Sequence, residues 1–327
     1  MAITLGSNTV VTVFGGSGFL GRYVVQALAQ AGCRIKVAVR RPDLALPLQP
    51  LGNVGQIALI QANIRDDRSV KEALRGAHAA VNLVGILQPS GRQKFAAVHA
   101  EGAARIAKLA RERGVESLVH VSAIGADRLS HSIYGRTKGE GEARVLGAFP
   151  EAVIVRPSLI FGPEDNFFNR FAWLSRVAPM MPLIGGKTRM QPVYAGDVGH
   201  AIKAALSGRA IEGAIYELGG PTVYTFRELL KKIGQWTGHP RPLFPIPFWI
   251  AKIPAFFVQL LPGAPITVDQ IRLLQRDNLV SAGVINAQRT LEGLGIQEPK
   301  SVELIVPTYL QRYRPQGEFS TDRVSVS

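Results

Sequence analysis

The sequence has little cysteine, few acidic residues and no long uninterrupted apolar run. Cys33 is the single cysteine of 327 residues, so no disulfide can form within the chain, which indicates a reducing compartment. Its six histidines have no metal-ligand spacing and no carboxylates cluster, so we expect no metal site. Residues 1–10 lack the pattern of a signal or transit peptide, and we expect an unprocessed chain.

The shortage of acidic residues leaves a net charge of +14, from 38 Lys and Arg against 24 Asp and Glu. Such proteins bind nucleic acids, anionic membranes, acidic partners or phosphorylated ligands. Residues 1–150 hold 19 basic and 10 acidic residues and the remainder 19 and 14, so the excess is spread along the chain. Because no zinc-finger spacing or RNA-binding signature accompanies it, we expect no nucleic-acid partner.

Short β-branched runs alternate with helical patterns in the first half of the chain. Strands are expected at 10–14, 34–39, 57–61, 79–84, 118–121 and 153–156, and helices at 20–31, 69–74, 95–113 and 134–146. This alternation is typical of an α/β fold with a doubly wound parallel sheet of the Rossmann type. We expect a first domain over 1–165, to which 190–225 return, and a smaller C-terminal α/β region over 166–327.

A glycine-rich turn follows the first expected strand and opens the first expected helix. Its residues are Gly15, Gly16, Ser17, Gly18, Phe19, Leu20 and Gly21. Gly15 permits a tight turn, Gly18 lets a pyrophosphate approach the backbone, and Gly21 lets the helix pack closely. The helix N-terminus offers free N–H groups to phosphates. The turn predicts a dinucleotide site rather than a glycine turn without a ligand.

The second expected strand ends at Arg40 and Arg41, with no acidic residue before Asp43. A ribose 2′-hydroxyl calls for a carboxylate at this point, whereas a 2′-phosphate calls for guanidinium groups. The pair therefore favours NADPH over NADH; alternatively, one arginine covers the sheet edge and the other is solvated. Further candidates for cofactor contact are Asn63 and Ile64 after the third strand and Val84 and Gly85 after the fourth.

Tyr134 and Lys138 are four residues apart, which places them on one face of a helix. A nearby ammonium lowers the pKa of a phenol, so the tyrosine could exchange a proton with a carbonyl or hydroxyl group while a nicotinamide exchanges hydride. Ser122 is placed to bond the same oxygen, with Ser130 and Ser132 as competitors. Alternatively, the pair contributes only to cofactor binding.

With the run Arg156-Pro157-Ser158-Leu159-Ile160-Phe161-Gly162-Pro163, these motifs resemble the extended and atypical branch of the short-chain dehydrogenase/reductase superfamily. A closer resemblance covers almost the whole chain, over 12–25, 149–165, 191–198 and 244–247. It is to the family of accessory NAD(P)H-binding subunits of respiratory complex I (NADH:ubiquinone oxidoreductase) and their bacterial relatives. The resemblance implies cofactor contacts at Arg156, Pro157, Ser158 and Ile160.

The resemblance also implies a tightly held, structural NADPH, complex I subunits as partners in electron transport, and a peripheral place on the membrane. That place is the cytoplasmic face of a bacterial inner membrane, or the matrix side in mitochondria. The chain reads Val98-His99-Ala100 where active superfamily members place an asparagine, which argues against turnover. The alternatives are a free-standing NADP-dependent reductase, a sugar-nucleotide epimerase or dehydratase, and a nucleotide-sensing regulator.

Two apolar segments follow the Arg-Pro run. Prolines interrupt residues 243–275 too often for a membrane-spanning helix. This segment either lies at a membrane interface or packs on a partner subunit, or it forms the core of the second region. The aromatic segment 167–173 either overhangs the nicotinamide or belongs to the core.

Overall fold

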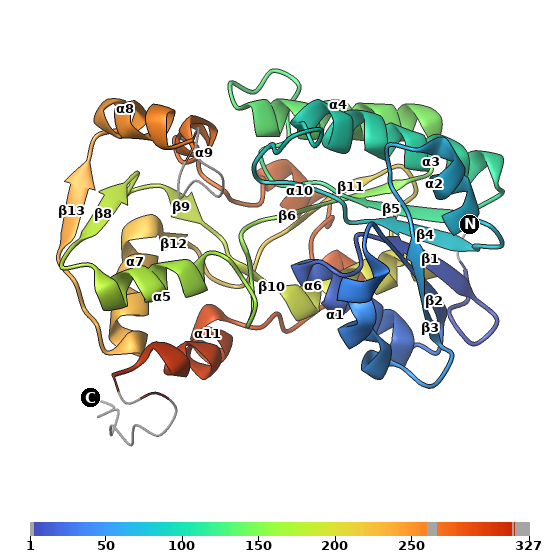
Figure 1. Cartoon of the computed structure of the whole chain (residues 1–327), viewed down its shortest axis with the longest axis horizontal. Helices are drawn as coiled ribbons and strands as arrows, with labels where there is room; N and C mark the ends of the chain where they lie inside the picture. The colour runs from blue at the N-terminus through green and yellow to red at the C-terminus, as the bar shows by residue number, and fades with distance from the viewer. Residues whose placement is uncertain (1–2, 260–266, 316, 318–327) are drawn as a thin grey trace. The chain divides into compact units, whose positions relative to one another are not determined.

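The computed structural model describes residues 3–259, 267–315 and 317, and the chain divides into two units (Figure 1). Unit 1 comprises Met1–Ser158, Ala195–Gly219 and Leu279–Pro299. Unit 2 comprises Leu159–Tyr194, Gly220–Asn278 and Lys300–Ser327. The chain therefore passes between the two units several times.

Unit 1 is built on a seven-stranded sheet in which every pair of neighbouring strands is parallel. In spatial order the strands are β11 (Ile215–Leu218), β6 (Val153–Pro157), β5 (Ser117–Val121), β4 (Ala79–Asn82), β1 (Val10–Phe14), β2 (Arg34–Val39) and β3 (Ile57–Gln61). The strand order reverses between β1 and β4, the point where open α/β sheets bind ligands. The predicted parallel sheet is confirmed.

Helices cover both faces of this sheet, as a doubly wound fold requires (Figure 1). One face carries α1 (Phe19–Gln30) and α6 (Ala195–Ala204), which runs into the π-helix η3 (Ala205–Arg209). The other carries α2 (Asp67–Ala73), the π-helix η2 (Ala96–Gly102) with its continuation α3 (Ala103–Glu112), and α4 (Ile133–Ala148). The 3-10 helices η1 (Pro42–Leu51) and η4 (Glu292–Leu294) and the short α10 (Ala282–Asn286) complete the unit.

On the face that carries α2, α3 and α4, the helices pack on the sheet through a core of fully buried side chains such as Phe14, Leu118, Ile154 and Ile106. Two elements differ in detail from the expectation. Strand β4 ends two residues early because the Val84 N–H donates to Asn82 Oδ1 (3.1 Å). The helix expected over 95–113 is continuous but begins with a π-helical segment.

Unit 2 has its own core, packed by α5 (Phe168–Val177), α7 (Phe226–Thr237) and α11 (Val302–Leu310). Three two-stranded pairs surround it: β7 (Ile160–Phe161) with β10 (Val193–Tyr194), β8 (Met181–Ile184) with β13 (Leu243–Ile246), and β9 (Arg189–Met190) with β12 (Tyr224–Thr225). The 3-10 helix η5 (Gln311–Tyr313) follows α11. Phe168 and Ala172 are fully buried, and Phe167 and Phe171 pack on the same cluster, so the core interpretation of 167–173 is confirmed for these residues, whereas Trp173 is 55% exposed.

The apolar segment 243–275 forms β13, α8 (Phe248–Val258) and α9 (Val268–Leu273), while its residues 260–266 lie outside the described residues. Ala251 and Ala255 of α8 are buried against α9. The larger side chains of α8 instead face outward. Among the described residues, no helix is long and apolar enough to cross a membrane.

Candidate nucleotide-binding site

The glycine turn lies at the carboxyl end of β1, beside the reversal of strand order. Gly15 has φ +79°, and a Cβ there would lie 3.2 Å from Val84 Cγ2 on the neighbouring strand end. A Cβ on Gly21 would overlap the carbonyl oxygen of Gly16, so α1 packs directly on the turn. These positions therefore require glycine for the reasons that a dinucleotide-binding turn requires it.

The start of α1 is arranged to receive an anion. Gly18 is the N-cap residue, no side chain caps the helix, and its first turn contains no acidic residue. The N–H groups at a helix start have no partner within the helix, and together with the helix dipole they attract a phosphate. Ser17, Phe19 and Leu20 supply the remaining backbone of this turn.

Arg40 directly follows β2, and Arg41 is the residue before η1. Both are exposed, and within the described part of the chain neither has a hydrogen-bond or ion-pair partner. Asp43, the nearest acidic residue in sequence, is exposed in the first turn of η1. Both guanidinium groups are thus available to a phosphate on the ribose.

The candidates after β3 and β4 have different surroundings. Asn63 Oδ1 accepts from the Arg65 backbone N–H (3.1 Å), whereas Ile64 is buried in the core against Gly102. Val84 packs on the same core, and a Cβ on Gly85 would lie 3.4 Å from Lys138 Nζ. The structure therefore brings the residues after β4 to the glycine turn and to Lys138, whereas the Ile64 side chain packs in the core.

Lys138 lies on α4 and is 4% exposed, with Nζ donating to the Val121 carbonyl oxygen (3.1 Å). Burial lowers the pKa of Lys138 to about 8, although Glu142 attracts the charge. Tyr134, one turn earlier, has its pKa raised by burial to about 12. The sequence predicted a lowered pKa for this phenol; burial opposes that, and Tyr134 keeps its proton at neutral pH.

Among the three candidate serines, Ser122 has the hydroxyl group without a partner. It directly follows β5 and is 4% exposed, and among the described residues its Oγ has no hydrogen-bond partner. Ser132 caps α4 by accepting the Gly135 N–H (3.2 Å), and Ser130 Oγ accepts the Ser132 N–H (3.2 Å). A buried hydroxyl group without a partner fits a site that a bound group completes.

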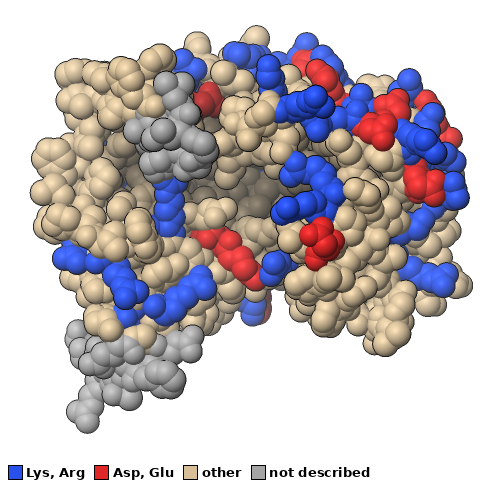
Figure 2. All heavy atoms as spheres, viewed as in Figure 1, with Lys and Arg blue, Asp and Glu red and all other residues tan. Residues whose placement is uncertain are grey.

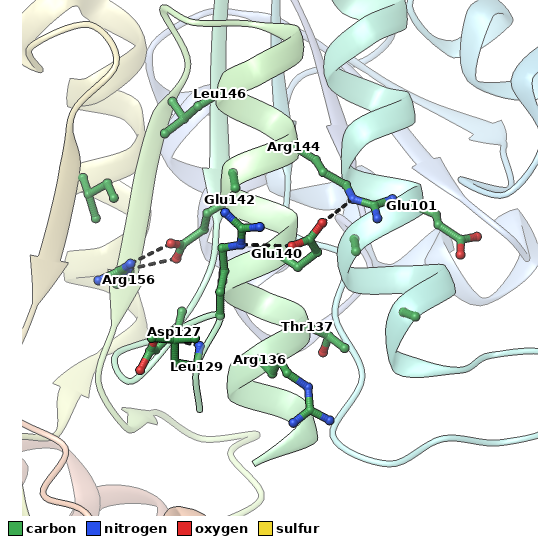
Figure 3. A pocket seen from close by; sticks show the side chains of 17 residues that line it. Glu101, Asp127, Leu129, Arg136, Thr137, Glu140, Glu142, Arg144, Leu146 and Arg156 are labelled. Carbon is green, nitrogen blue, oxygen red and sulfur yellow. Dashed lines mark hydrogen bonds and ion pairs between the residues drawn. The ribbon is translucent and has the colours of Figure 1, made fainter. Parts of the chain in front are cut away.

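The Arg-Pro run at the end of β6 takes a structural position. Arg156 Nη2 is 2.6 Å from Glu142 Oε2, and Nη1 is 3.4 Å from Glu217 Oε1. Arg156 lines a hollow of about 930 Å³ along α4 (Figure 3), which none of the glycine-turn residues lines. Pro157 ends β6, and the Ser158 N–H donates to the Leu218 carbonyl (2.9 Å).

Ile160 belongs to β7 of unit 2, whereas the rest of the run up to Ser158 belongs to unit 1. The structure thus brings the glycine turn, Val84, Gly85 and Lys138 together in unit 1, and Arg156 takes part in a separate ion network. No group of three or more His, Cys, Asp or Glu side chains suited to a metal occurs among the described residues.

One residue at the site was not among the sequence candidates. His99 lies in η2, is 1% exposed, and contacts the ring of Tyr134 edge to face at 5.3 Å between centroids. Its nitrogens bond Ile86 and Thr137. The sequence signal that could have identified His99 is its position as a polar residue between Val98 and Ala100 in an apolar helical pattern.

The model of the NAD dependent epimerase/dehydratase family matches residues 11–219. Among curated proteins, the chain is 36% identical over 295 residues to NADH dehydrogenase (ubiquinone) 1 alpha subcomplex subunit 9 of Arabidopsis thaliana, covering 86% of this chain and 73% of that protein. It is 34% identical to the Mus musculus protein of that name, covering 97% and 83%. A ceramide reductase of Caulobacter vibrioides is 31% identical over 58% of each chain.

Solved structures share the fold at lower identity. A NADPH-dependent quinone oxidoreductase of Escherichia coli, complexed with NADPH, has a TM-score of 0.73 at 18% identity, covering 92% of this chain and 99% of that one. The UDP-glucose 4-epimerase of Thermus thermophilus, complexed with NAD, has a TM-score of 0.66 at 20% identity, covering 92% and 99%. The chain therefore belongs to the NAD dependent epimerase/dehydratase family, in the group that also contains these complex I subunits.

Proposed function

We propose that this protein is an NADPH-binding accessory subunit of respiratory complex I, in which the nucleotide has a structural role in the peripheral arm. The relatives named as complex I subunits are similar to it over most of its length. The glycine turn, the uncapped start of α1 and the exposed arginines after β2 suit a bound dinucleotide. When bound, NADPH would supply hydride chemistry at its nicotinamide; the residues of this chain bind and orient it.

The similarity over most of the chain to relatives named as complex I subunits carries this proposal. The glycine turn and the uncapped start of α1 supply the features that hold phosphates, which a structural nucleotide also requires. The choice of NADPH over NADH rests on Arg40 and Arg41, because guanidinium groups pair with a 2′-phosphate.

A second candidate function is a free-standing NADPH-dependent reductase, or an epimerase or dehydratase of the extended type. The unpartnered Ser122 hydroxyl favours it, because a carbonyl or hydroxyl group of a substrate would complete that site. Tyr134 and Lys138 would then exchange the proton. Turnover of NADPH with a panel of carbonyl and quinone substrates, lost in Tyr134→Phe, would support this second function.

The experiment for the leading proposal is purification of the native protein from membranes under mild conditions. We expect the chain to co-migrate with complex I subunits and to release NADPH, rather than NADH, on denaturation. The double variant, Arg40→Ala with Arg41→Ala, should lose the bound nucleotide and should no longer co-migrate with complex I subunits. Recovery of the chain solely as a free species without nucleotide would contradict the proposal.

We also propose that α8 rests on an anionic membrane surface, the cytoplasmic face of a bacterial inner membrane. On α8, Trp249, Ile253 and Phe257 recur every four residues and are 58–69% exposed, opposite the buried Ala251 and Ala255. An outward stripe of this kind suits the interface between headgroups and acyl chains.

The charge around α8 supports a lipid surface over an apolar protein partner. The charged residues nearest to α8 in sequence are Arg241 before it, Lys252 on it and Asp269 after it. In Figure 2 the surface at the end labelled α8 in Figure 1 is almost entirely uncharged. An uncharged stripe whose neighbours in sequence carry a net positive charge is complementary to anionic headgroups.

Vesicle binding tests this surface. We expect the whole protein to sediment with vesicles that contain anionic phospholipid and less with neutral ones, and Trp249→Ser with Phe257→Ser to weaken binding at least about tenfold. The matched control, Leu304→Ser with Ile285→Ser, removes equally exposed apolar side chains elsewhere. Equal sedimentation of the α8 variant and the control would rule out this surface.

A further inference from the structure

We propose that His99 is a positioning residue that ties the backbone after β4 to the start of α4, and so sets the nicotinamide end of the NADPH site. The inference rests on the proposed NADPH binding. It assigns a definite task to a buried residue that the proposed function does not otherwise use.

Both ring nitrogens of His99 are engaged. The Ile86 backbone N–H donates to Nε2 (3.1 Å), so Nε2 carries no proton. The proton of the neutral ring is therefore on Nδ1, which donates to Thr137 Oγ1 (3.1 Å). Thr137 Oγ1 in turn donates to the carbonyl of Ile133 (2.9 Å) in the first turn of α4. His99 thus connects two backbone segments that are far apart in sequence.

The surroundings of His99 keep it neutral. Burial and the charge of Lys138 lower its pKa to about 3. A neutral ring with both nitrogens bonded cannot take up or release a proton without breaking one of these bonds. The residue is therefore suited to positioning rather than to proton transfer.

Packing fixes His99 from several sides. Its ring stacks on Phe95 (5.4 Å, 30°) and meets Tyr134 edge to face (5.3 Å, 87°). A Cβ on Gly141 of α4 would overlap the His99 carbonyl oxygen, so the two helices touch at their backbones. A Cβ on Gly85 would lie 3.8 Å from His99 Nε2. Movement of His99 would thus shift the backbone at Gly85 and Ile86 relative to Tyr134.

Two amide substitutions separate the two hydrogen bonds. In His99→Gln the amide group sits at the distance of Nε2 and can accept the Ile86 N–H. In His99→Asn the amide sits nearer the backbone, at the distance of Nδ1, and can reach Thr137 but not Ile86. We expect His99→Asn to weaken NADPH binding about tenfold and His99→Gln by about twofold or less, because one hydrogen bond to the backbone is lost or kept.

A ligand lacking the nicotinamide provides the internal control. We expect the affinity for 2′,5′-ADP to be unchanged in both variants, because His99 bonds Ile86 and Thr137 rather than the glycine turn or Arg40. The fluorescence of bound NADPH should shift toward that of the free nucleotide in His99→Asn alone. If His99→Asn fails to fold, Thr137→Val, at a half-buried position, removes the bond that His99→Gln also loses and should weaken NADPH binding by about twofold, with 2′,5′-ADP binding unchanged.

Equal weakening by Asn and Gln, or equal weakening of NADPH and 2′,5′-ADP binding, would overturn the role of His99. Unchanged NADPH binding in His99→Asn would overturn it as well. Failure of the unaltered protein to bind either ligand would instead contradict the proposed function itself. Weakening confined to NADPH and to His99→Asn supports the inference.

Discussion

The two ends of the candidate site differ in the exposure and protonation of their charged and titratable groups. At the phosphate end, the glycine turn offers backbone N–H groups, and Arg40 and Arg41 are exposed and without partners in the described structure. At the nicotinamide end, Lys138 and His99 are buried, with lowered pKa values, and Tyr134 keeps its proton. The first end is suited to holding an anion, while the second holds a neutral His99 and a protonated Tyr134 beside the buried ammonium group of Lys138.

The largest expected effect concerns the buried end in acid. His99 and His120 both have a pKa near 3 in the folded chain against 6.5 in the unfolded chain, through burial and the charge of Lys138. The unfolded chain therefore binds more protons between these values, so the free energy of unfolding falls as the pH drops below 6.5. At about pH 5 we expect a loss of about 2 kcal/mol for each histidine.

Urea unfolding near neutral pH and near pH 5 measures this loss. His99→Gln should reduce the pH-dependent part by about half, because one titrating group is gone. The exposed His131→Gln should leave it unchanged. An identical pH dependence in all three proteins would mean that the nicotinamide end is not the acid-sensitive end.

The next effect tests the phosphate end through its backbone. In Gly21→Ala the new methyl group overlaps the Gly16 carbonyl, which displaces α1 from the turn. We expect NADPH binding to weaken about a hundredfold, by roughly 3 kcal/mol. Gly147→Ala, on the exposed side of α4 with open space around it, is the matched control and should leave binding unchanged. Equal titration curves for the two variants would show that the turn does not hold the nucleotide.

A smaller effect tests the charge of the same end. Arg40→Ala with Arg41→Ala should weaken NADPH binding about thirtyfold, because a charge-assisted bond to an exposed phosphate is partly screened by salt. Binding of NADH, which lacks the 2′-phosphate, should stay within about twofold, so the ratio of the two affinities reports the effect. Arg34→Ala, at the opposite end of β2, is the control. A preserved ratio in the double variant would argue for another phosphate partner.

The smallest effect concerns Tyr134. If the nucleotide is structural, Tyr134→Phe should change NADPH retention by about twofold or less, since the ring and its contact with His99 remain. Retention after gel filtration measures it. A tenfold loss of retention would give the phenol hydroxyl a binding role and make the two ends equally important for holding the nucleotide.

The sequence predicted those parts of unit 1 that depend on local pattern. Strands β1, β2 and β3 lie at their expected residues, because each coincides with a short run rich in β-branched and other apolar residues. The start of α7 is equally local, because its capping box spans only the four residues from Thr225 to Glu228.

Features that depend on distant contacts were not predictable in this way. The bonds of His99 reach Ile86 and Thr137, and Arg156 turns toward Glu142 and Glu217, which no short motif encodes. The pKa of Tyr134 depends on burial, which the four-residue spacing to Lys138 does not report. Sequence patterns identified the residue types at the site, while their protonation states followed from packing.

The segment Leu279–Pro299 has a consequence for cutting this chain into pieces. It belongs to unit 1 although it follows most of unit 2, and its Ser281 N–H donates to Glu217 Oε2 (2.8 Å). The Arg289 carbonyl accepts the Glu217 N–H (3.1 Å) on the edge strand β11. A protein ending before residue 279 would leave a buried carboxylate with one bond fewer and an open sheet edge. Neither unit can therefore be produced as one contiguous stretch, and a stop codon before residue 279 would remove part of both units.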